Sequence, residues 1–526
     1  MKRLRDPESL ASNKQKRVAP NYVASNYMEQ TAGISRAIAQ ARLAQSTWQA
    51  VRVKDRSNRI ARFAGLVVEQ RRRLSEGILY PTRSGYLETI TSELLPLAET
   101  GKWLSSNAAR VLRARKTSRL STPMWLGSQS SRIERVPRGV VLILGTWNYP
   151  IFLTGSQMLH ALVAGNAVVI KPAPGCESVT QQLASMCVEC GIPADLIWVL
   201  ESSIQAGQQA MEVGVDHVVM TGSSRSGRRV IEQSIPSLCS STLELSGSDA
   251  VFVLPSADLE RVTSLLRFGL RLNGGATCIA PRRVFVIETM LDRFNTMLKD
   301  KINQPSGSQW SSWITSGTYD QLQPLVQKAL DQGATMLTDW YCDPQSHQTL
   351  SYPTGQSNWL ATGQIVLSGV TPNMDLYGLD VFAPLLTVVP VRDIDQAIEY
   401  NRQCRYGLCA SVFGSESQAA MLAPRIQAGS ILLNDFVVPT ADPRLPFGGR
   451  GESGYGVTRG EEGLLEMTIP QVISTKRGKW LPHSDLPHPK DEQLLDGLLQ
   501  FRHGKDWKLR LDGLKQIFGA IRRNPN

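Results

Sequence analysis

One cysteine of this chain lies in a setting that suits chemistry better than packing. Residues 270–283 read LRLNGGATCIAPRR, so Cys278 is surrounded by glycine, alanine and threonine. A packed core would place bulkier side chains around a thiol, and a metal site would place a second ligand nearby. Cys278 is therefore a candidate nucleophile, which requires close approach by its substrate, an oxyanion donor and a base for turnover.

A carboxylate is the better candidate for that base. The six histidines of the chain fall in no recognisable motif, so a cysteine–histidine pair has no support. Glu244 lies near the end of the short apolar run TLEL, which is followed by serine and glycine. An acidic residue at the carboxyl end of a parallel strand lies where such sheets bind ligands. A solvated glutamate at the end of a strand is the other interpretation.

An asparagine is the candidate oxyanion donor. Asn148 follows the apolar run GVVLIL within GTWNYP. Its side chain either caps a turn or presents its amide to a developing negative charge. Both interpretations stay open on the residues alone.

The elements that must position these residues alternate regularly along the chain. Two helical stretches are expected first, over residues 54–79 and from about 87 to 115. Short apolar runs then occur at 139–144, 167–170, 197–200, 217–220 and 242–245, separated by segments of helical length. This order predicts a parallel sheet with helices on both faces. A second alternation from about 250 to 433, with strand-like runs at 283–287 and 385–391, predicts a second α/β domain in series.

Composition and charge exclude several classes of protein. The chain has 526 residues, 42% hydrophobic and 20% charged, which is typical of a multidomain globular protein. Of the net charge of +11, residues 1–20 carry +4 and residues 475–526 carry +5. Nucleic-acid binders usually carry a basic face on the folded domain, so we expect solvated basic tails and no nucleic-acid partner. Contact of the tails with a polyanion or a membrane is the alternative.

The apolar runs and the cysteine spacing indicate where the protein is expected and whether it binds a metal. It contains no apolar run of 18 residues, and its basic start has no apolar core that would mark a secretory signal. Eight cysteines in a chain this long do not form a disulfide framework, so we expect a reducing, cytoplasmic compartment. Cys187 and Cys190 form a CxxC pair within a predicted helix, without a second pair at zinc spacing. No metal site is predicted.

The C-terminal region predicts an amphipathic helix. Apolar side chains recur on one face of that helix, at Trp507, Leu511, Leu514, Phe518 and Ile521. The helix either docks onto the body of the protein or lies on a membrane surface as a peripheral contact, and simple disorder is a third interpretation.

Seven stretches, in the same order, resemble the signatures of the aldehyde dehydrogenase superfamily. They are GTWNYP, GNAVVIKPAP, TGSSRSG, LELSG, GATCIAP, VFAPLL and LPFGGRGESGYG, and the resemblance covers roughly residues 30–475. GTWNYP, CIAP and LNDF…LPFGG resemble most the branch that acts on fatty and aromatic aldehydes. The resemblance implies an α/β fold of two parallel-sheet, Rossmann-like domains with a small strand-exchange arm.

The resemblance also implies a reaction, the NAD(P)-dependent oxidation of an aldehyde to a carboxylic acid. Cys278 as thiolate attacks the aldehyde carbonyl, and the Asn148 amide with the Cys278 backbone N–H holds the oxyanion. Hydride passes to a nicotinamide, which leaves a thioester on Cys278. Glu244 then activates the water that hydrolyses this thioester.

Cofactor residues are implied motif by motif. Lys171 contacts the adenosine ribose, and Gly222 and Ser223 meet the pyrophosphate at the start of a helix. Trp147 lies beside the pyrophosphate, and Asp380 with Phe382 holds the nicotinamide ribose. The implied cofactor set also contains Thr146, Gly227 and Leu245, and the implied substrate and loop residues are Tyr149 and Phe447.

Four positions depart from the family pattern. Pro174 stands where many relatives have a glutamate that accepts the ribose 2′-hydroxyl, so either NAD or NADP is expected. Asp380 replaces a glutamate and is one methylene shorter, which puts the tightness of the nicotinamide clamp in doubt. Ala276 takes a frequent glutamine position and Ser246 a frequent glycine position. We interpret these changes as tuning of an active enzyme.

The resemblance implies the organisation of the chain. The expected parts are a disordered basic tail (1–20), a dinucleotide-binding domain (21–128 and 138–247), a catalytic domain (248–440), an oligomerisation arm (129–137 and 464–475) and a basic extension with an amphipathic helix (476–526). The expected partners are a hydrophobic aldehyde and further copies of the chain, in a homodimer or homotetramer.

Two other functions on the same fold compete with this one. A CoA-acylating or reductive enzyme would not need Glu244 as a base. A non-catalytic scaffold would tolerate the loss of Cys278.

Overall fold

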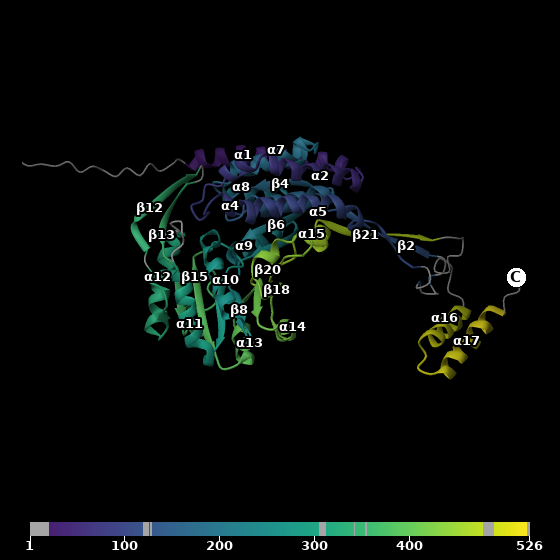
Figure 1. Cartoon of the computed structure of the whole chain (residues 1–526). Coiled ribbons are helices and arrows are strands. Elements are labelled where there is room, and N and C mark those ends of the chain that lie inside the picture. The colour runs from purple at the N-terminus through teal and green to yellow at the C-terminus, as the bar shows by residue number, and fades with distance from the viewer. Residues whose placement is uncertain are drawn as a thin grey trace, which may run out of the picture. The chain divides into compact units, whose positions relative to one another are not determined.

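The computed structural model describes residues 20–118, 122, 126, 129–304, 312–340, 342–352, 355–476 and 489–522 (Figure 1). Two compact units are present: a large unit of residues 1–112 and 136–469, and a small unit of residues 113–135 and 470–526. Apart from Pro20, the tail predicted at 1–20 lies outside the described residues. The chain segments expected to carry out chemistry all belong to the large unit.

The first sheet of the large unit contains the five strands expected from the apolar runs. They are β3 (Val140–Leu144), β4 (Ala167–Lys171), β5 (Ile197–Val199), β6 (His217–Gly222) and β7 (Ser240–Leu245), in the order β7-β6-β3-β4-β5, all parallel. From β3 the chain adds β4 and β5 on one side and β6 and β7 on the other. The loops after β3 and β6 therefore diverge and leave a crevice at the carboxyl ends of these strands.

Helices cover both faces of this sheet, as predicted. Helices α1 (Pro20–Trp48), α8 (Ile204–Val213) and α9 (Ser224–Ser234) pack together on one side; α2 (Val53–Glu69), α5 (Leu95–Val111), α6 (Phe152–Ala164) and α7 (Glu177–Glu189) pack on the other. The first expected helix is divided at Gln70, where α3 (Arg71–Glu76) begins. The second consists of α4 (Tyr86–Thr89), the π-helix η1 (Ile90–Leu94) and α5 in succession.

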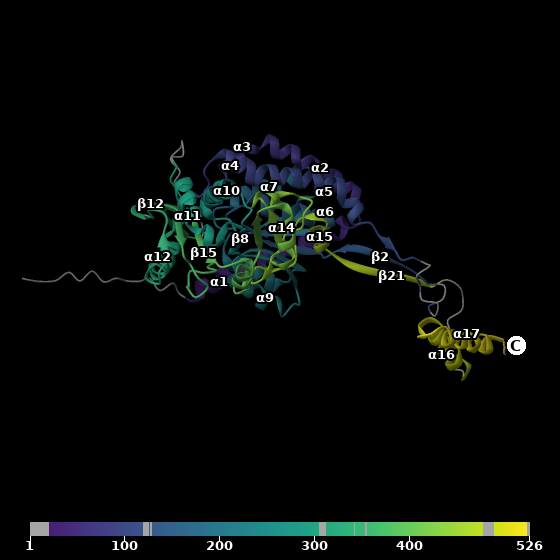
Figure 2. The same cartoon turned by 60° about the horizontal axis from the view of Figure 1, so that its bottom comes forward.

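The second sheet has seven strands in the order β11-β14-β15-β9-β8-β17-β18. Its strands are β8 (Asp249–Val253), β9 (Pro281–Ile287), β11 (Thr335–Met336), β14 (Ile365–Ser368), β15 (Leu385–Val391), β17 (Cys409–Phe413) and β18 (Ser430–Leu433), parallel except for β11. Helices α10 (Leu259–Arg271), α11 (Glu288–Asn303), α12 (Ser316–Asp331), α13 (Ile394–Arg402) and α14 (Glu416–Leu422) accompany it (Figures 1 and 2). The predicted fold class of two parallel α/β sheets is confirmed.

Several short elements of the large unit were not predicted. Strands β10 (Ser312–Thr315), β12 (Cys342–Tyr352) and β13 (Gly355–Thr362) form a separate antiparallel sheet. Strand β16 (Tyr406–Gly407) pairs with β19 (Arg450–Gly451), and β20 (Gly454–Tyr455) extends the first sheet by pairing antiparallel with β7. The remaining elements are α15 (Gly460–Glu466) and the 3-10 helices η3 (Ala194–Leu196), η4 (Leu272–Gly275), η5 (Ala423–Arg425) and η6 (Val438–Ala441).

The small unit contains strands at both positions predicted for the arm. Strands β1 (Arg115–Lys116), β2 (Gln129–Pro137) and β21 (Thr468–Lys476) form one sheet. The predicted amphipathic helix is α17 (Trp507–Arg522), and it packs against α16 (Pro489–His503), which was not predicted. A Cβ atom on Gly513 would lie 2.5 Å from the carbonyl oxygen of Gly497, so the two helices approach closely through these glycines.

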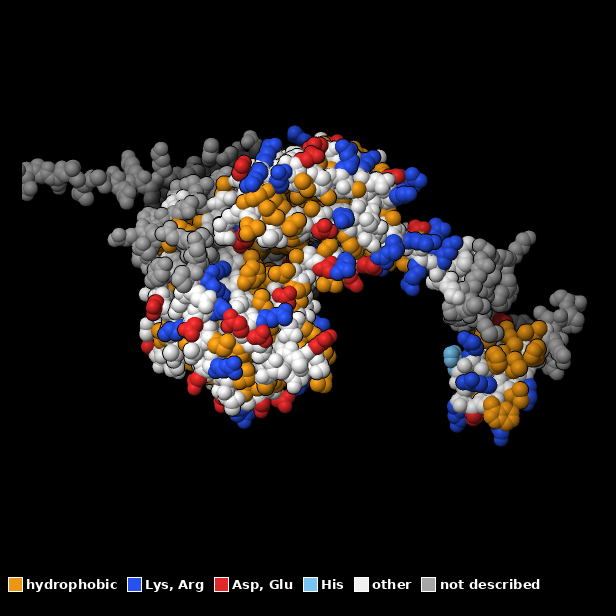
Figure 3. All heavy atoms as spheres, viewed as in Figure 1, with side chains coloured by type: hydrophobic (Ala, Val, Ile, Leu, Met, Phe, Trp, Pro, Cys, Tyr) orange, Lys and Arg blue, Asp and Glu red, His pale blue; other side chains and the backbone are white. Residues whose placement is uncertain are grey.

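The helical hairpin of α16 and α17 keeps large apolar side chains at its surface (Figure 3). They include Leu495, Leu499, Trp507, Phe518 and Ile521, of which Trp507 is 70% exposed. Among the described residues, no helix has both the length and the apolar character needed to cross a membrane.

Candidate active site

One cavity of about 1090 Å³ lies in the large unit, bordered by the loops at the carboxyl ends of both parallel sheets. Its walls contain twelve of the residues that the sequence singled out: Thr146, Trp147, Asn148, Tyr149, Gly222, Ser223, Glu244, Leu245, Cys278, Asp380, Phe382 and Phe447. The three candidate catalytic residues thus come to one cavity from three separate segments: Asn148 from the loop after β3, Glu244 from strand β7 and Cys278 from the loop before β9.

The Cys278 loop is shaped by its glycines. After α10 the backbone takes left-handed values at Asn273 (φ 50°), Gly274 (φ 60°) and Gly275 (φ 79°). A Cβ atom on Gly275 would lie 2.4 Å from the carbonyl oxygen of Ala383, so only glycine fits. These glycines are buried beneath the loop and make its turn, and Cys278 lies half-buried at the cavity wall.

The charge state of Cys278 depends on its neighbours. Burial raises the pKa of the Cys278 thiol to about 12, and the negative charges of Glu244 and Asp249 act in the same direction. The Arg459 guanidinium and the Cys278 backbone N–H oppose the increase. Because the thiolate is the nucleophilic form, the site needs positive charge or a base beside the sulfur to form it.

Glu244 is the last but one residue of β7, and it lines the cavity. The Thr458 hydroxyl donates a hydrogen bond to one carboxylate oxygen, and the Thr221 hydroxyl lies 3.5 Å from the other. Burial raises the pKa of Glu244, whereas the charge of Arg459 and these hydroxyl donors lower it. A buried carboxylate with a raised pKa is a better proton acceptor than an exposed one, which suits the activation of water.

The orientation of the Asn148 amide follows from its hydrogen bonds. Its Oδ1 accepts the Thr146 hydroxyl at 2.7 Å and the Tyr149 backbone N–H at 3.1 Å. Its Nδ2 donates to the carbonyl oxygen of Ala276 at 2.9 Å, two residues before Cys278. Because two donors fix the oxygen, the NH₂ group must face the Cys278 loop, and its second hydrogen can meet an oxyanion.

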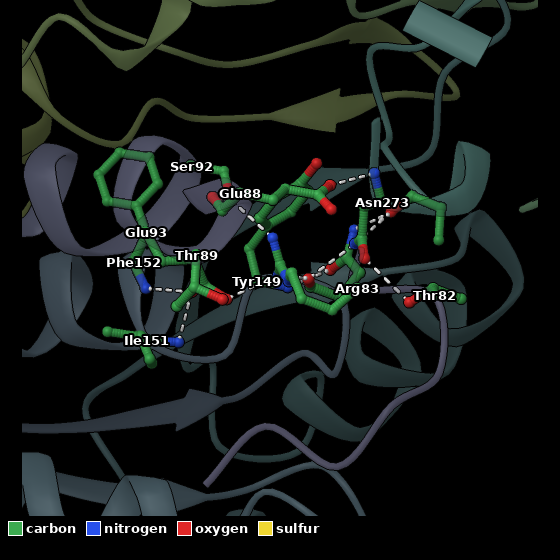
Figure 4. A network of polar contacts seen from close by, with 12 residues as sticks. Thr82, Arg83, Glu88, Thr89, Ser92, Glu93, Tyr149, Ile151, Phe152 and Asn273 are labelled. Atoms are coloured by element: carbon green, nitrogen blue, oxygen red, sulfur yellow. Dashed lines mark hydrogen bonds and ion pairs between the residues drawn. The ribbon is translucent and has the colours of Figure 1, made fainter. Parts of the chain in front are cut away.

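Arg83, Glu93 and Asn273 belong to a buried polar network (Figure 4), and this network fixes the backbone of Asn148. Arg83 donates to the Asn148 carbonyl oxygen and to Glu93, each at 2.8 Å, and Asn273 Nδ2 donates to the same carbonyl at 2.9 Å. Glu93, on the π-helix η1, also accepts the backbone N–H groups of residues 151 and 152, each at 2.8 Å. The loop after β3 and the start of α6 are therefore held from one side by one carboxylate and one guanidinium.

The opposite part of the cavity suits a dinucleotide. Ser223 caps α9, where its hydroxyl accepts the Ser226 N–H at 3.2 Å, and the first turn of this helix opens to the cavity next to Gly222. Such a helix start binds anionic groups through its N–H groups and its dipole. The Asp380 carboxylate accepts a hydrogen bond from Ser246, so two of the departures from the family pattern are in contact.

Comparison with known proteins agrees with this geometry. The model of the Aldehyde dehydrogenase family matches residues 11–473. The chain belongs to the aldehyde dehydrogenase family. It is 28% identical over 490 residues to 4,4′-diapolycopene aldehyde oxidase of a Methylomonas species, covering 91% of this chain and 88% of that protein. It is 29% identical over 460 residues to a putative succinate-semialdehyde dehydrogenase [NADP(+)] of Mycobacterium tuberculosis, with 85% of each chain covered.

Solved structures share the fold of this dehydrogenase. A Mycobacterium tuberculosis aldehyde dehydrogenase complexed with NAD⁺ has a TM-score of 0.75 at 23% identity, over 85% of this chain and 90% of that one. A succinic semialdehyde dehydrogenase from Streptococcus pyogenes in complex with NADP⁺ has a TM-score of 0.74 at 23% identity, over 85% and 95%. The implied fold is therefore confirmed.

Two of the predicted cofactor residues lie outside the cavity wall of the dehydrogenase. Lys171 ends β4 and its aliphatic chain packs against Gly207, and burial lowers the pKa of its ammonium group. Gly227 is buried on α9, where a Cβ atom would lie 2.7 Å from the Leu245 side chain. Gly227 thus allows α9 to pack closely on β7. Pro174 does line the cavity, without a carboxylate at that point.

Some residues of the dehydrogenase site gave no sequence signal. Trp147 lies in an aromatic cluster with Tyr80, Trp359 and Phe382, at ring-centroid distances of 4.9, 5.6 and 5.6 Å. Trp359 comes from β13, whose position over the cavity no motif indicates. Arg459 follows the GYG stretch, where its charge suggests exposure, yet it is only 4% exposed and lines the cavity. Only tertiary packing brings these side chains to the site.

Proposed function

We propose that this aldehyde dehydrogenase oxidises an aldehyde to a carboxylic acid with NAD or NADP. The observation that carries the proposal is the meeting of Cys278, Glu244 and Asn148 in one cavity that also opens to the start of α9. The start of α9 would hold the pyrophosphate of a bound cofactor and Asp380 would hold its nicotinamide ribose, and the nicotinamide would supply a hydride acceptor. The catalytic roles of the three residues are inferred from this placement.

The positions of the side chains support the following reaction. The Cys278 sulfur bonds to the carbonyl carbon, and the oxygen that becomes negative is held by the Asn148 amide and the Cys278 backbone N–H. Loss of hydride from that carbon, for which a bound oxidised cofactor would be the acceptor, leaves a thioester on Cys278. Glu244 takes a proton from water as its oxygen attacks, the carbon–sulfur bond breaks, and the acid leaves with Cys278 restored.

We further propose that the aldehyde is hydrophobic, in keeping with the branch that acts on fatty and aromatic aldehydes. Many apolar side chains line the cavity, and of these Ile279, Val437 and Phe447 belong to the same apolar cluster as Cys278. The others are Phe152, Leu153, Phe268, Leu272 and Val438. The relative named for an apolar carotenoid aldehyde supports this choice, whereas the relatives named for succinate semialdehyde favour a short, charged substrate. Pro174 removes a carboxylate that would repel a 2′-phosphate, so we include NADP beside NAD.

Assembly and location complete the proposal. The sheet formed by β2 and β21 supports a homodimer or homotetramer made by strand exchange. The cysteine side chains that the structure describes are all free thiols, which supports a cytoplasmic location. The division into dinucleotide-binding and catalytic domains stays a prediction, as does a peripheral membrane contact through α17.

The test is single-turnover absorbance at 340 nm with a medium-chain aldehyde, with NAD and NADP run in parallel. We expect a burst of reduced cofactor that Cys278→Ala abolishes and that Glu244→Gln retains without further turnover. Succinate semialdehyde run beside the apolar aldehyde decides the substrate class. If neither cofactor is reduced across several aldehydes, the proposal is wrong. Reduction of an acyl-CoA would then support the CoA-linked alternative.

A further inference from the structure

The cavity wall contains one buried cation that no motif assigns. Arg459 directly follows Thr458, the hydrogen-bond donor to Glu244, and its backbone has φ 62° and ψ 171°. That region is almost confined to glycine, and strained residues of this kind cluster at functional sites. The strain is tolerated because the turn is packed tightly: a Cβ atom on Gly460 would lie 2.8 Å from the Pro446 nitrogen.

The Arg459 guanidinium is held by uncharged groups. Its carbon lies 4.4 Å from the centroid of the Phe447 ring and 5.2 Å from that of Phe152, within range of cation–π attraction. Its Nη1 donates to the Thr440 carbonyl oxygen, and its Nε is buried without a hydrogen-bond partner. No described carboxylate lies within ion-pair distance of it. A desolvated guanidinium left in this state needs negative charge from elsewhere.

The negative charge available to Arg459 is that of the reacting groups. The groups that interact electrostatically with Cys278 are Glu244, Asp249, Arg459, Arg282, Cys409 and Tyr149. The two terminal nitrogens of Arg282 are already used by the backbone, because they donate to the carbonyl oxygens of residues 275, 383 and 385. Burial favours the uncharged form of Asp249 and raises its pKa well above the usual range. Arg459 remains as the cation that acts on both reacting groups.

We propose that Arg459 is the counter-cation of this active site, and that its caged guanidinium stabilises the negative charges of Cys278 and Glu244. The inference rests on the proposed function, in which Cys278 is the nucleophile and Glu244 the base. In the resting enzyme the two groups destabilise each other's charge, and a fixed cation in the same cavity wall reduces that penalty. Arg459 acts through them and is a positioning residue that sets their charge.

The test measures the thiolate of Cys278 without substrate or cofactor. Full-length protein is alkylated with uncharged iodoacetamide at pH 8, and modification of the Cys278 peptide is followed by mass spectrometry. Below the pKa the rate is proportional to the thiolate fraction, so one unit of pKa is about a tenfold change. We expect Arg459→Leu and Arg459→Gln to react about tenfold more slowly, and Arg459→Lys to recover most of the rate.

Arg444→Leu is the matched control, because Arg444 lies in the same part of the chain with an exposed ion pair to Asp442. We expect it to react at the wild-type rate. A purely structural role predicts the opposite sign for Arg459→Leu, since a loosened loop exposes the thiol and speeds alkylation. An unchanged or faster rate in the two neutral variants overturns the inference. The 340 nm burst of the unmodified enzyme tests the proposed function separately.

Discussion

The candidate catalytic side chains Asn148 and Glu244 are held by contacts that leave one polar group of each free to act. The side-chain oxygen Oδ1 of Asn148 accepts two hydrogen bonds, and one N–H of its amide donates to the Ala276 carbonyl oxygen. The second N–H of the amide stays free beside the Cys278 loop. Glu244 is restrained by Thr458 and Thr221 through hydroxyl groups that carry no charge. Restraint of this kind lets the site hold its geometry without neutralising the groups that react.

Removal of the Asn148 amide is expected to affect catalysis much more than nucleophile formation. We predict that Asn148→Ala lowers kcat by a factor of about 10² to 10³, the usual cost of one oxyanion donor. The measurement is the rate of the 340 nm burst, and alkylation of Cys278 by iodoacetamide reports whether the loop remains intact. A normal burst rate in the variant would exclude the oxyanion role.

Two buried histidines are expected to make the protein sensitive to acid. Burial lowers the pKa of His160 to about 4 and that of His217 to about 3, against an ordinary value of 6.5. The unfolded chain therefore protonates these two imidazoles first, so their contribution to stability is constant above about pH 7 and falls as the pH decreases from 6.5 toward 4. Between pH 7 and pH 5 each histidine should remove about 2 kcal/mol of unfolding free energy.

Urea unfolding at the two pH values measures this loss. His160→Gln should reduce the difference between pH 7 and pH 5, whereas His503→Gln, at an exposed histidine on α16, should leave it unchanged. An equal pH dependence in all three proteins would show that other groups cause the acid sensitivity.

At the scale of elements, the sequence predicted what repeats and missed what depends on packing. The buried strands β3, β4, β6 and β7 were located to within two residues, because continuous apolar runs between helical segments have few other interpretations. The π-helix η1 left no pattern, because one extra residue in a turn does not change the residue types around Glu93. The aromatic cluster and the buried position of Arg459 were missed because both depend on side chains from distant segments of the chain. The π-helix η1 matters because it directs Glu93 to the backbone N–H groups at the start of α6.

Loss of the Glu93 charge is expected to destabilise the large unit. Glu93→Gln leaves the Arg83 guanidinium, which is buried with it, without its carboxylate partner. Breaking a buried pair in this way costs about 3–5 kcal/mol of unfolding free energy. Urea unfolding checks this figure, with Glu461→Gln as control because its ion pair with Arg110 is exposed and should be worth less than about 1 kcal/mol. Equal losses in both variants would contradict the buried-pair argument.

At the scale of the whole molecule, the two parallel sheets of the large unit both border the cavity. One strand, β20, joins the segment after Phe447 to Glu244, the candidate base. Strand β20 pairs with β7, with Gly454 opposite Glu244. A Cβ atom on Gly454 would lie 1.9 Å from the Leu243 carbonyl oxygen, so this contact requires glycine. The segment from Phe447 to Arg459 is therefore fixed against the first sheet, although it follows the second sheet in the chain.

Every residue assigned a chemical role lies in the large unit, so the helical hairpin of α16 and α17 should be dispensable for chemistry. We predict that a chain ending at Lys476 keeps the 340 nm burst and the turnover rate of the full-length enzyme. The exposed apolar side chains of the hairpin should instead serve contacts outside the site, because large apolar patches mark interaction surfaces.

Two measurements on the full-length and shortened chains identify what the hairpin contacts. Light scattering gives the size of the assembly, and co-sedimentation with anionic vesicles gives membrane binding. A smaller assembly in the shortened chain assigns the hairpin to the oligomer, and lost vesicle binding assigns it to a membrane surface. Loss of turnover in a shortened chain that still alkylates normally at Cys278 would contradict the prediction. In that case the hairpin would have to complete an active site, and the large unit would not contain all of the catalytic machinery.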